Sequence, residues 1–187
     1  MKSTIILLLV AITTLALAGV ASAEDTSKSN DVSTNCAEIC KWAGSEKVKL
    51  VAGQHIDAGT VNAYVDRDNN NLVVEYKTKD GWKLHDTHLY VGTEPPAKHA
   101  PGLFPYKSGI LSGVTSYTYV IPLSDIVSDC EVDRERKTIY LAAHADVKKQ
   151  GAGSETAWGE GGLIHEKGPW AMYFALNLKC VCEPVPK

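Results

Sequence analysis

The chain has 187 residues, of which 44% are hydrophobic, 22% are charged and 7% are aromatic, and its formal net charge is −3. This balance excludes the charge-rich, apolar-poor class of disordered chains and also the class of multi-span membrane proteins. The length suits one globular domain, and the slightly negative charge gives no electrostatic reason to expect a nucleic-acid partner.

The first 23 residues have the three parts of a secretory signal peptide. A basic second residue precedes an apolar run that reaches Ala18, and Ala21-Ser22-Ala23 supplies a small-residue cleavage site. The sequence therefore predicts a secreted or cell-surface protein without a membrane span after cleavage. The cleavage site disfavours the alternative of a retained transmembrane anchor. The next segment, 24–35, contains one apolar residue and is expected to be a polar leader.

Five cysteines follow, at Cys36, Cys40, Cys130, Cys180 and Cys182. In an exported chain this distribution favours disulfides, and we expect Cys36 and Cys40 to bond to two of the three later cysteines. The alternative is a metal or cluster site, which the C-x-x-x-C and C-x-C spacings disfavour. Two bonds leave one cysteine without a partner in the chain, and that cysteine would be free or bonded to another chain.

Residues 36–183 are predicted to form one domain, followed by a short tail at 184–187. Period-two alternation of apolar and polar residues, typical of half-buried strands, recurs along this domain. The first predicted strands lie at 47–51, 61–65, 72–77 and 82–91. Polar turns join the last three, which predicts a hairpin and then an antiparallel meander.

A segment rich in glycine and proline, 92–106, interrupts the strands, and a loop of that length is usually functional or covers an open sheet edge. Further strands are predicted at 116–121, 138–147 and 170–178. Helical periodicity is nearly absent, with single turns expected at 36–42 and 123–128. The sequence thus predicts an all-β fold, a single antiparallel β-sandwich of about seven strands with long Gly/Pro-rich loops.

Two histidines lie on predicted strands. In the sixth predicted strand the odd-numbered residues are apolar, so the opposite face carries His144 and Asp146, while His88 lies on one face of the fourth strand. If the two imidazoles meet across the sheet, they could bind a divalent metal with a carboxylate from Glu155, Glu160 or Asp146. No short metal motif accompanies them, which favours the alternative of histidines hydrogen-bonded to backbone or acidic neighbours.

The glycine-rich segment 151–162 contains Glu155, Trp158 and Glu160. Glycines let a backbone approach a ligand closely, and a tryptophan in a loop offers a flat face on which a sugar can stack. The alternative is a long turn whose tryptophan plugs one end of the sandwich. Nothing fixes the separation of the two carboxylates, so they are no glycosidase signature.

Other motifs are incomplete. Asp66-x-Asp68-x-Asn70 has the alternating oxygen ligands of a calcium loop, but Lys77 stands where the loop's last acid belongs, which favours a hairpin turn. Ser154 does not lie in a G-x-S-x-G elbow. Without a complete catalytic signature, the sequence favours a non-enzymatic role.

Five segments together carry a resemblance: THLYVG at Thr87–Gly92, HAPGLFPY at His99–Tyr106, LAAHA at Leu141–Ala145, GSETAWGEG at Gly153–Gly161 and WAMYF at Trp170–Phe174. The set resembles a group of exported microbial β-rich proteins with no assigned activity, over roughly residues 60–178. The resemblance implies export, one domain and a recurring site that unites the segments of His88, His144 and 155–160. It implies no catalytic role.

The leading prediction is an extracellular or cell-surface module that binds a ligand, glycan or cell-surface partner through loops at one end of the sandwich. The expected contact residues are Trp158, Glu155, Glu160, His144 and His88. One alternative is a structural or hydrolytic metal site made by His88, His144 and Glu155, with a divalent metal as its cofactor. The other is a structural envelope or filament subunit, in which the glycine-rich segment and the odd cysteine make subunit contacts.

Overall fold

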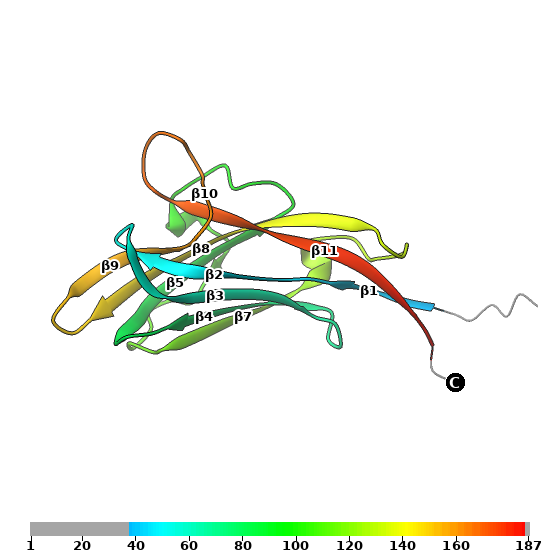
Figure 1. Ribbon diagram of the computed structural model, residues 1–187, viewed down its shortest axis with the longest axis horizontal. Coiled ribbons are helices and arrows are strands. Elements are labelled where there is room, and N and C mark those ends of the chain that lie inside the picture. Colours follow the sequence, from blue (N-terminus) through cyan, green and yellow to red (C-terminus); the bar gives the residue numbers. More distant parts are fainter. Residues whose placement is uncertain (1–37, 186–187) are drawn as a thin grey trace, which may run out of the picture. The chain divides into compact units, whose positions relative to one another are not determined.

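The computed structural model describes residues 38–185 (Figure 1), so the predicted signal peptide, the polar leader and Cys36 lie outside the described residues. The described strands are β1 (Glu38–Ala43), β2 (Ser45–Ala52), β3 (Ile56–Asp66), β4 (Asn71–Thr78), β5 (Trp82–Gly92), β6 (Tyr106–Lys107), β7 (Ser116–Pro122), β8 (Arg136–Lys149), β9 (Gly153–Gly159), β10 (Gly162–Leu163) and β11 (Met172–Pro184). Two short 3-10 turns, η1 (Pro101–Leu103) and η2 (Leu123–Asp125), complete the elements. Within 38–185, no helix is long and apolar enough to cross a membrane.

The strands pair antiparallel in one sheet of eleven strands, whose main order in space is β1-β11-β8-β9-β2-β3-β4-β7. β8 is the organising strand because its 14 residues pair with three neighbours. Its first half pairs with β11 and its second half with β9, while β5 runs along its other edge. β5, β8 and β9 therefore lie side by side (Figure 1).

The sheet folds back on itself, so that strands far apart in the order meet. The Tyr119 hydroxyl on β7 donates a hydrogen bond of 2.9 Å to the Thr87 carbonyl on β5 and lies 2.8 Å from the Thr87 hydroxyl. The Tyr76 hydroxyl on β4 donates to the His88 carbonyl at 3.2 Å. The apolar core fills the space between these strands and includes Val61, Val74, Leu84, Leu89, Ile139 and Leu141. One face of β5 thus packs on the core, and its other face is left for a site.

Replacing Tyr119 by phenylalanine is expected to lower the free energy of unfolding by about 1–3 kcal/mol, because the buried Thr87 groups lose their partner. Burial also raises the pKa of Tyr119 to about 12. A tyrosine in an unfolded chain ionises near pH 10, so the folded protein loses stability as the pH rises from about 10 towards 12. Urea unfolding at pH 8 and at pH 11 measures both effects, and the phenylalanine variant should lose less stability between the two pH values.

Tyr117 is the matched control, since its ring packs 5.0 Å from that of Tyr119 but its hydroxyl makes no hydrogen bond within the described residues. Tyr117→Phe should change the stability by a few tenths of a kcal/mol only. Equal stabilities of the two variants would contradict this account of the contact between β5 and β7.

The prediction of an antiparallel all-β domain is confirmed, including the hairpin of β3 and β4 and the 3-10 turn that begins at Leu123. The predicted sandwich is not confirmed, because the eleven strands, and not about seven, belong to one sheet. The turn expected at 36–42 is wrong in its described part, where β1 pairs with β11. The meander is also wrong. Both edges of β4 are taken by β3 and β7, so β5 pairs with β8 instead.

Two disulfides link β11 to other parts of the chain. Cys40 of β1 bonds to Cys182 of β11, and Cys130 bonds to Cys180, also on β11. The expectation for Cys40 is confirmed, whereas the bond expected from Cys36 to a later cysteine is wrong because all three later cysteines are paired with other residues.

Candidate functional site

The candidate site lies on the faces of β5, β8 and β9 that point away from the main core. An irregularity in the pairing of β5 with β8, between Leu84 and Asp86, shifts the alternation along β5. Leu84 and Leu89 are therefore both buried in the core, and Asp86 and His88 lie on the outer face. This corrects the simple alternation, which would put Leu84, Asp86 and His88 on the same face.

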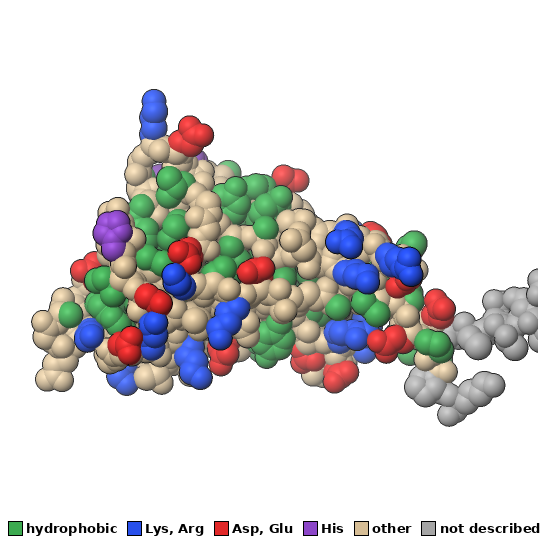
Figure 2. Space-filling model, viewed as in Figure 1, with side chains coloured by type: hydrophobic (Ala, Val, Ile, Leu, Met, Phe, Trp, Pro, Cys, Tyr) green, Lys and Arg blue, Asp and Glu red, His purple; other side chains and the backbone are tan. Residues whose placement is uncertain are grey.

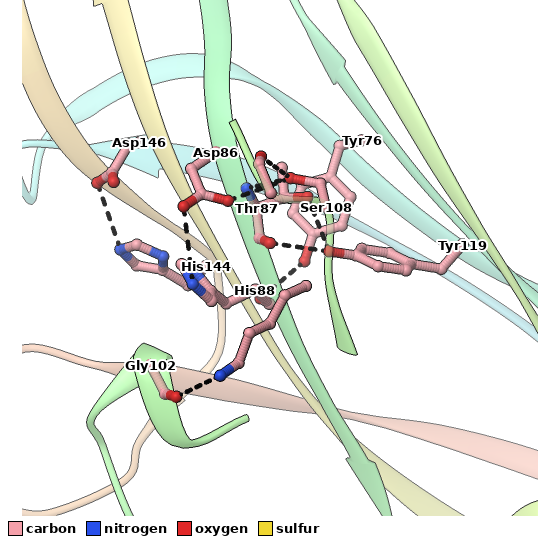
Figure 3. A network of polar contacts seen from close by, with 11 residues as sticks. Tyr76, Asp86, Thr87, His88, Gly102, Ser108, Tyr119, His144 and Asp146 are labelled. Carbon is pink, nitrogen blue, oxygen red and sulfur yellow. Dashed lines mark hydrogen bonds and ion pairs between the residues drawn. The ribbon is translucent and has the colours of Figure 1, made fainter. Parts of the chain in front are cut away.

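Four side chains form what we call the Asp-His quartet: Asp86 and His88 on β5, and His144 and Asp146 on β8 (Figure 3). In the strand register, His88 lies opposite His144 and Asp86 lies opposite Asp146. The two imidazole centroids are 5.5 Å apart. Nε2 of His88 is 3.7 Å from Oδ2 of Asp86, and Nε2 of His144 is 3.8 Å from Oδ1 of Asp146. Both Nδ1 atoms are buried without a hydrogen-bond partner.

Burial shifts the pKa values of two members of the quartet, His144 and Asp146. His144 is only 5% exposed, and burial, together with the neighbouring His88, lowers its pKa to about 3. Its imidazole is therefore neutral at physiological pH. Burial and then the charge of Asp86 raise the pKa of Asp146. The quartet thus contains the neutral imidazole of His144 beside a carboxyl group, that of Asp146, whose pKa is raised.

The neighbours of the quartet hold it in place (Figure 3). The Ser108 hydroxyl donates a hydrogen bond of 3.1 Å to Oδ1 of Asp86 and accepts one of 2.9 Å from the Thr87 backbone N–H. Lys107 of β6 lies opposite His88, but its ammonium group donates to the Gly102 carbonyl at 2.6 Å. The lysine charge is therefore directed to the loop after β5.

A second, smaller core flanks the quartet. The Trp158 ring on β9 packs against His144, with 4.9 Å between ring centroids, and Phe104 packs against Trp158 at 6.1 Å. Ala142 and Ala171 complete this cluster. It fixes the loop that contains Phe104 and the segment before β11 onto the outer face of the sheet.

Between these loops and the sheet lies a cavity of about 330 Å³, which we call the aromatic cavity. Its walls include His99, His144, Thr156, Trp158 and Trp170. A second cavity of about 480 Å³ adjoins Asp86 and Asp146 on the same face and shares Thr156. Figure 2 shows hydrophobic side chains gathered around β10 and the adjoining loops, above a band where acidic and basic side chains alternate.

The structure brings together three of the five predicted contact residues, His88, His144 and Trp158. Glu155 pairs with Val147 on the core-facing side of β9, and its carboxylate approaches Gly53. The predicted metal set of His88, His144 and Glu155 is therefore not brought together.

Glu160 is exposed just beyond β9, and its backbone N–H donates to the Lys49 carbonyl. The segment 153–159 is strand β9, and Trp158 within it is 3% exposed, so the expected loop with an open tryptophan face is wrong.

Sequence reasoning missed Asp86, His99 and Trp170. The Asp-x-His spacing of β5, mirrored by His-x-Asp in β8, is a signal that could have found Asp86. His99 lies in the Gly/Pro-rich loop, for which only the length of the loop indicated a functional role. Trp170 was assigned to a strand, but β11 begins at Met172, so Trp170 lies in the loop beside the aromatic cavity.

The Asp66 motif is a turn, in agreement with the sequence. The Asp66 carboxylate accepts hydrogen bonds from the backbone N–H groups of Asp68 and Asn69 and from the Asn69 side chain. These bonds lower the pKa of Asp66 and close the hairpin between β3 and β4.

No protein-family model, no curated protein and no solved structure matches this chain.

Proposed function

We propose that the protein is a secreted or cell-surface module that binds an extracellular ligand in the aromatic cavity. The observation that carries the proposal is the neutral, buried imidazole of His144, which lines a cavity walled by Trp158 and Trp170 and whose Nδ1 has no partner. Buried polar atoms in a folded protein are normally hydrogen-bonded, so an unpartnered one beside a cavity marks a place for a ligand group. The two disulfides suit an oxidising extracellular compartment.

The chemistry of the walls favours a neutral ring that carries hydroxyl groups, such as a sugar unit of a glycan. The half-buried Trp170 ring offers an apolar face for the C–H side of a sugar, while His99, His144 and Thr156 offer hydrogen bonds. No lysine, arginine or carboxylate lines the cavity. A strongly charged ligand would therefore find no opposite charge there.

Trp170→Ala tests the proposal. Trp170 is half-buried and lies outside the strands, so its loss should weaken binding of neutral oligosaccharides at least about tenfold and leave the melting temperature within a few degrees of wild type. The probe is a panel of neutral oligosaccharides, screened on a surface and then titrated calorimetrically. Tyr64→Ala, which removes a 37% exposed aromatic residue of β3 away from the cavity, is the matched control. If no oligosaccharide binds, or if Trp170→Ala binds as wild type does, the proposal fails.

A further inference from the structure

We infer that the Asp-His quartet binds a divalent transition-metal ion of the zinc type through the imidazoles of His88 and His144 and the carboxylates of Asp86 and Asp146. This inference goes beyond ligand binding in the aromatic cavity, because it concerns a different ligand and three side chains that do not line that cavity.

The strand register places all four groups on one surface. Residues two apart in a strand point to the same face, so Asp86 and His88 form one dyad and His144 and Asp146 form another. Because β5 and β8 are antiparallel, histidine lies opposite histidine and aspartate opposite aspartate. Side chains directly opposite one another have Cβ atoms about 5 Å apart, which is within reach of a single ion.

The histidines supply a further observation, which includes the Nδ1 atom of His144 that also supports ligand binding in the aromatic cavity. His144 is 95% buried, its Nδ1 has no hydrogen-bond partner, and the buried Nδ1 of His88 has none either. An unpaired nitrogen in the interior is costly, and a bond to a metal would satisfy one on each ring. The two aspartates add a second reason, because like charges directly opposite on neighbouring strands repel and a cation between them removes that repulsion.

The donor set indicates the kind of ion. Imidazole nitrogen with carboxylate oxygen suits Zn²⁺ and related transition metals, whereas Ca²⁺ and Mg²⁺ prefer oxygen ligands alone. The Ser108 hydroxyl, which donates to Asp86, is the kind of outer contact that orients a metal-binding carboxylate.

The four side chains of the quartet must move closer together to bind one ion. Within 38–185, only Cys40, Cys180 and Cys182 already have three ligand atoms within 4.8 Å of one another, and disulfides occupy those sulfurs. The separations of 3.7 and 3.8 Å run from Nε2 of each imidazole to a carboxylate oxygen and are too long for hydrogen bonds. Neither aspartate is therefore hydrogen-bonded to its histidine, and its carboxylate can turn towards an ion held at the two Nδ1 atoms. The Asp146 side chain is 53% exposed and can rotate inwards.

The test is a calorimetric titration of the exported, disulfide-bonded protein with ZnCl₂, after purification without an affinity metal and treatment with chelator. One Zn²⁺ per chain is expected, together with a rise in melting temperature that depends on the zinc concentration. His88→Ala and Asp86→Asn should each weaken Zn²⁺ binding at least about tenfold. His55→Ala, which removes an exposed histidine from the turn between β2 and β3, should leave the affinity unchanged.

Co²⁺ substitution gives a second reading, since a four-coordinate site absorbs visible light strongly and that absorption should vanish in His88→Ala. If a histidine variant fails to fold, the Zn²⁺ affinity of Asp86→Asn still tests the inference. Absence of Zn²⁺ binding by the wild type, or equal affinity of the quartet variants and wild type, would overturn the inference. Trp170→Ala separates it from the proposed function, because that variant should lose oligosaccharide binding and keep its Zn²⁺ affinity.

Discussion

Replacing Trp158 by alanine is expected to lower the free energy of unfolding by about 3–5 kcal/mol. The side chain is 3% exposed and packs against both His144 and Phe104. Its removal leaves a void between β9 and the loop that contains Phe104, and the rigid strands on either side cannot collapse to fill it. Urea unfolding followed by circular dichroism measures the loss.

Trp158→Phe is the matched variant, because it keeps an aromatic ring at the centre of the second core. It should lose clearly less stability than Trp158→Ala. Equal stability of the alanine variant and wild type would show that the second core does not support the fold. Since Trp158 is structural, a loss of binding in Trp158→Ala would not identify a ligand contact, and for this reason Trp170 tests the proposed function.

The strands were predictable where one face is buried and the other is not. Val61 and Ala63 of β3 and Val74 and Tyr76 of β4 alternate with more exposed residues, and the hairpin follows from the polar turn between the strands. The partner of β5 was not predictable in this way. Alternation reports which face of a strand is buried and says nothing of which strand lies beside it, and the β8 partner is about fifty residues further along the chain.

The site was predictable in part for the same reason. His88 and His144 stand out because polar residues on a buried strand need an explanation. Simple alternation also put Asp86 on the face of His88, but together with the apolar Leu84, and only the pairing irregularity after Leu84 separates the two polar residues from the core.

Gly159 and Gly161 were interpreted as part of a loop but serve close packing, whereas Gly153 has a positive φ and open space around it. A Cβ atom at Gly159 would lie 3.0 Å from the Phe174 ring, and one at Gly161 would collide with the Tyr173 carbonyl oxygen. Composition does not distinguish these two uses of glycine.

Removing the Cys40–Cys182 disulfide, by changing both residues to serine, is expected to lower the free energy of unfolding by about 2–5 kcal/mol. The bond links residues 142 positions apart, whereas Cys130–Cys180 spans 50 positions. In the chain-entropy account a longer closed loop restrains the unfolded chain more, so the corresponding Cys130/Cys180 double variant should lose less stability. Thermal unfolding of the two variants under non-reducing conditions compares them, and the reverse order would contradict this account.

The loss should be confined to one side of the sheet in the folded state. β1 has β11 as its strand partner, and its inner residue Trp42 is held by a hydrogen bond of 2.9 Å from Nε1 to the Ser128 carbonyl. β8 is held by β5, β9 and β11 without either disulfide. Hydrogen exchange of the Cys40/Cys182 variant should therefore show faster exchange in β1 and the end of β11, with protection in β8 retained. Loss of protection at His144 and its neighbours would mean instead that the candidate site depends on the disulfide, because β8 would then unfold together with β1.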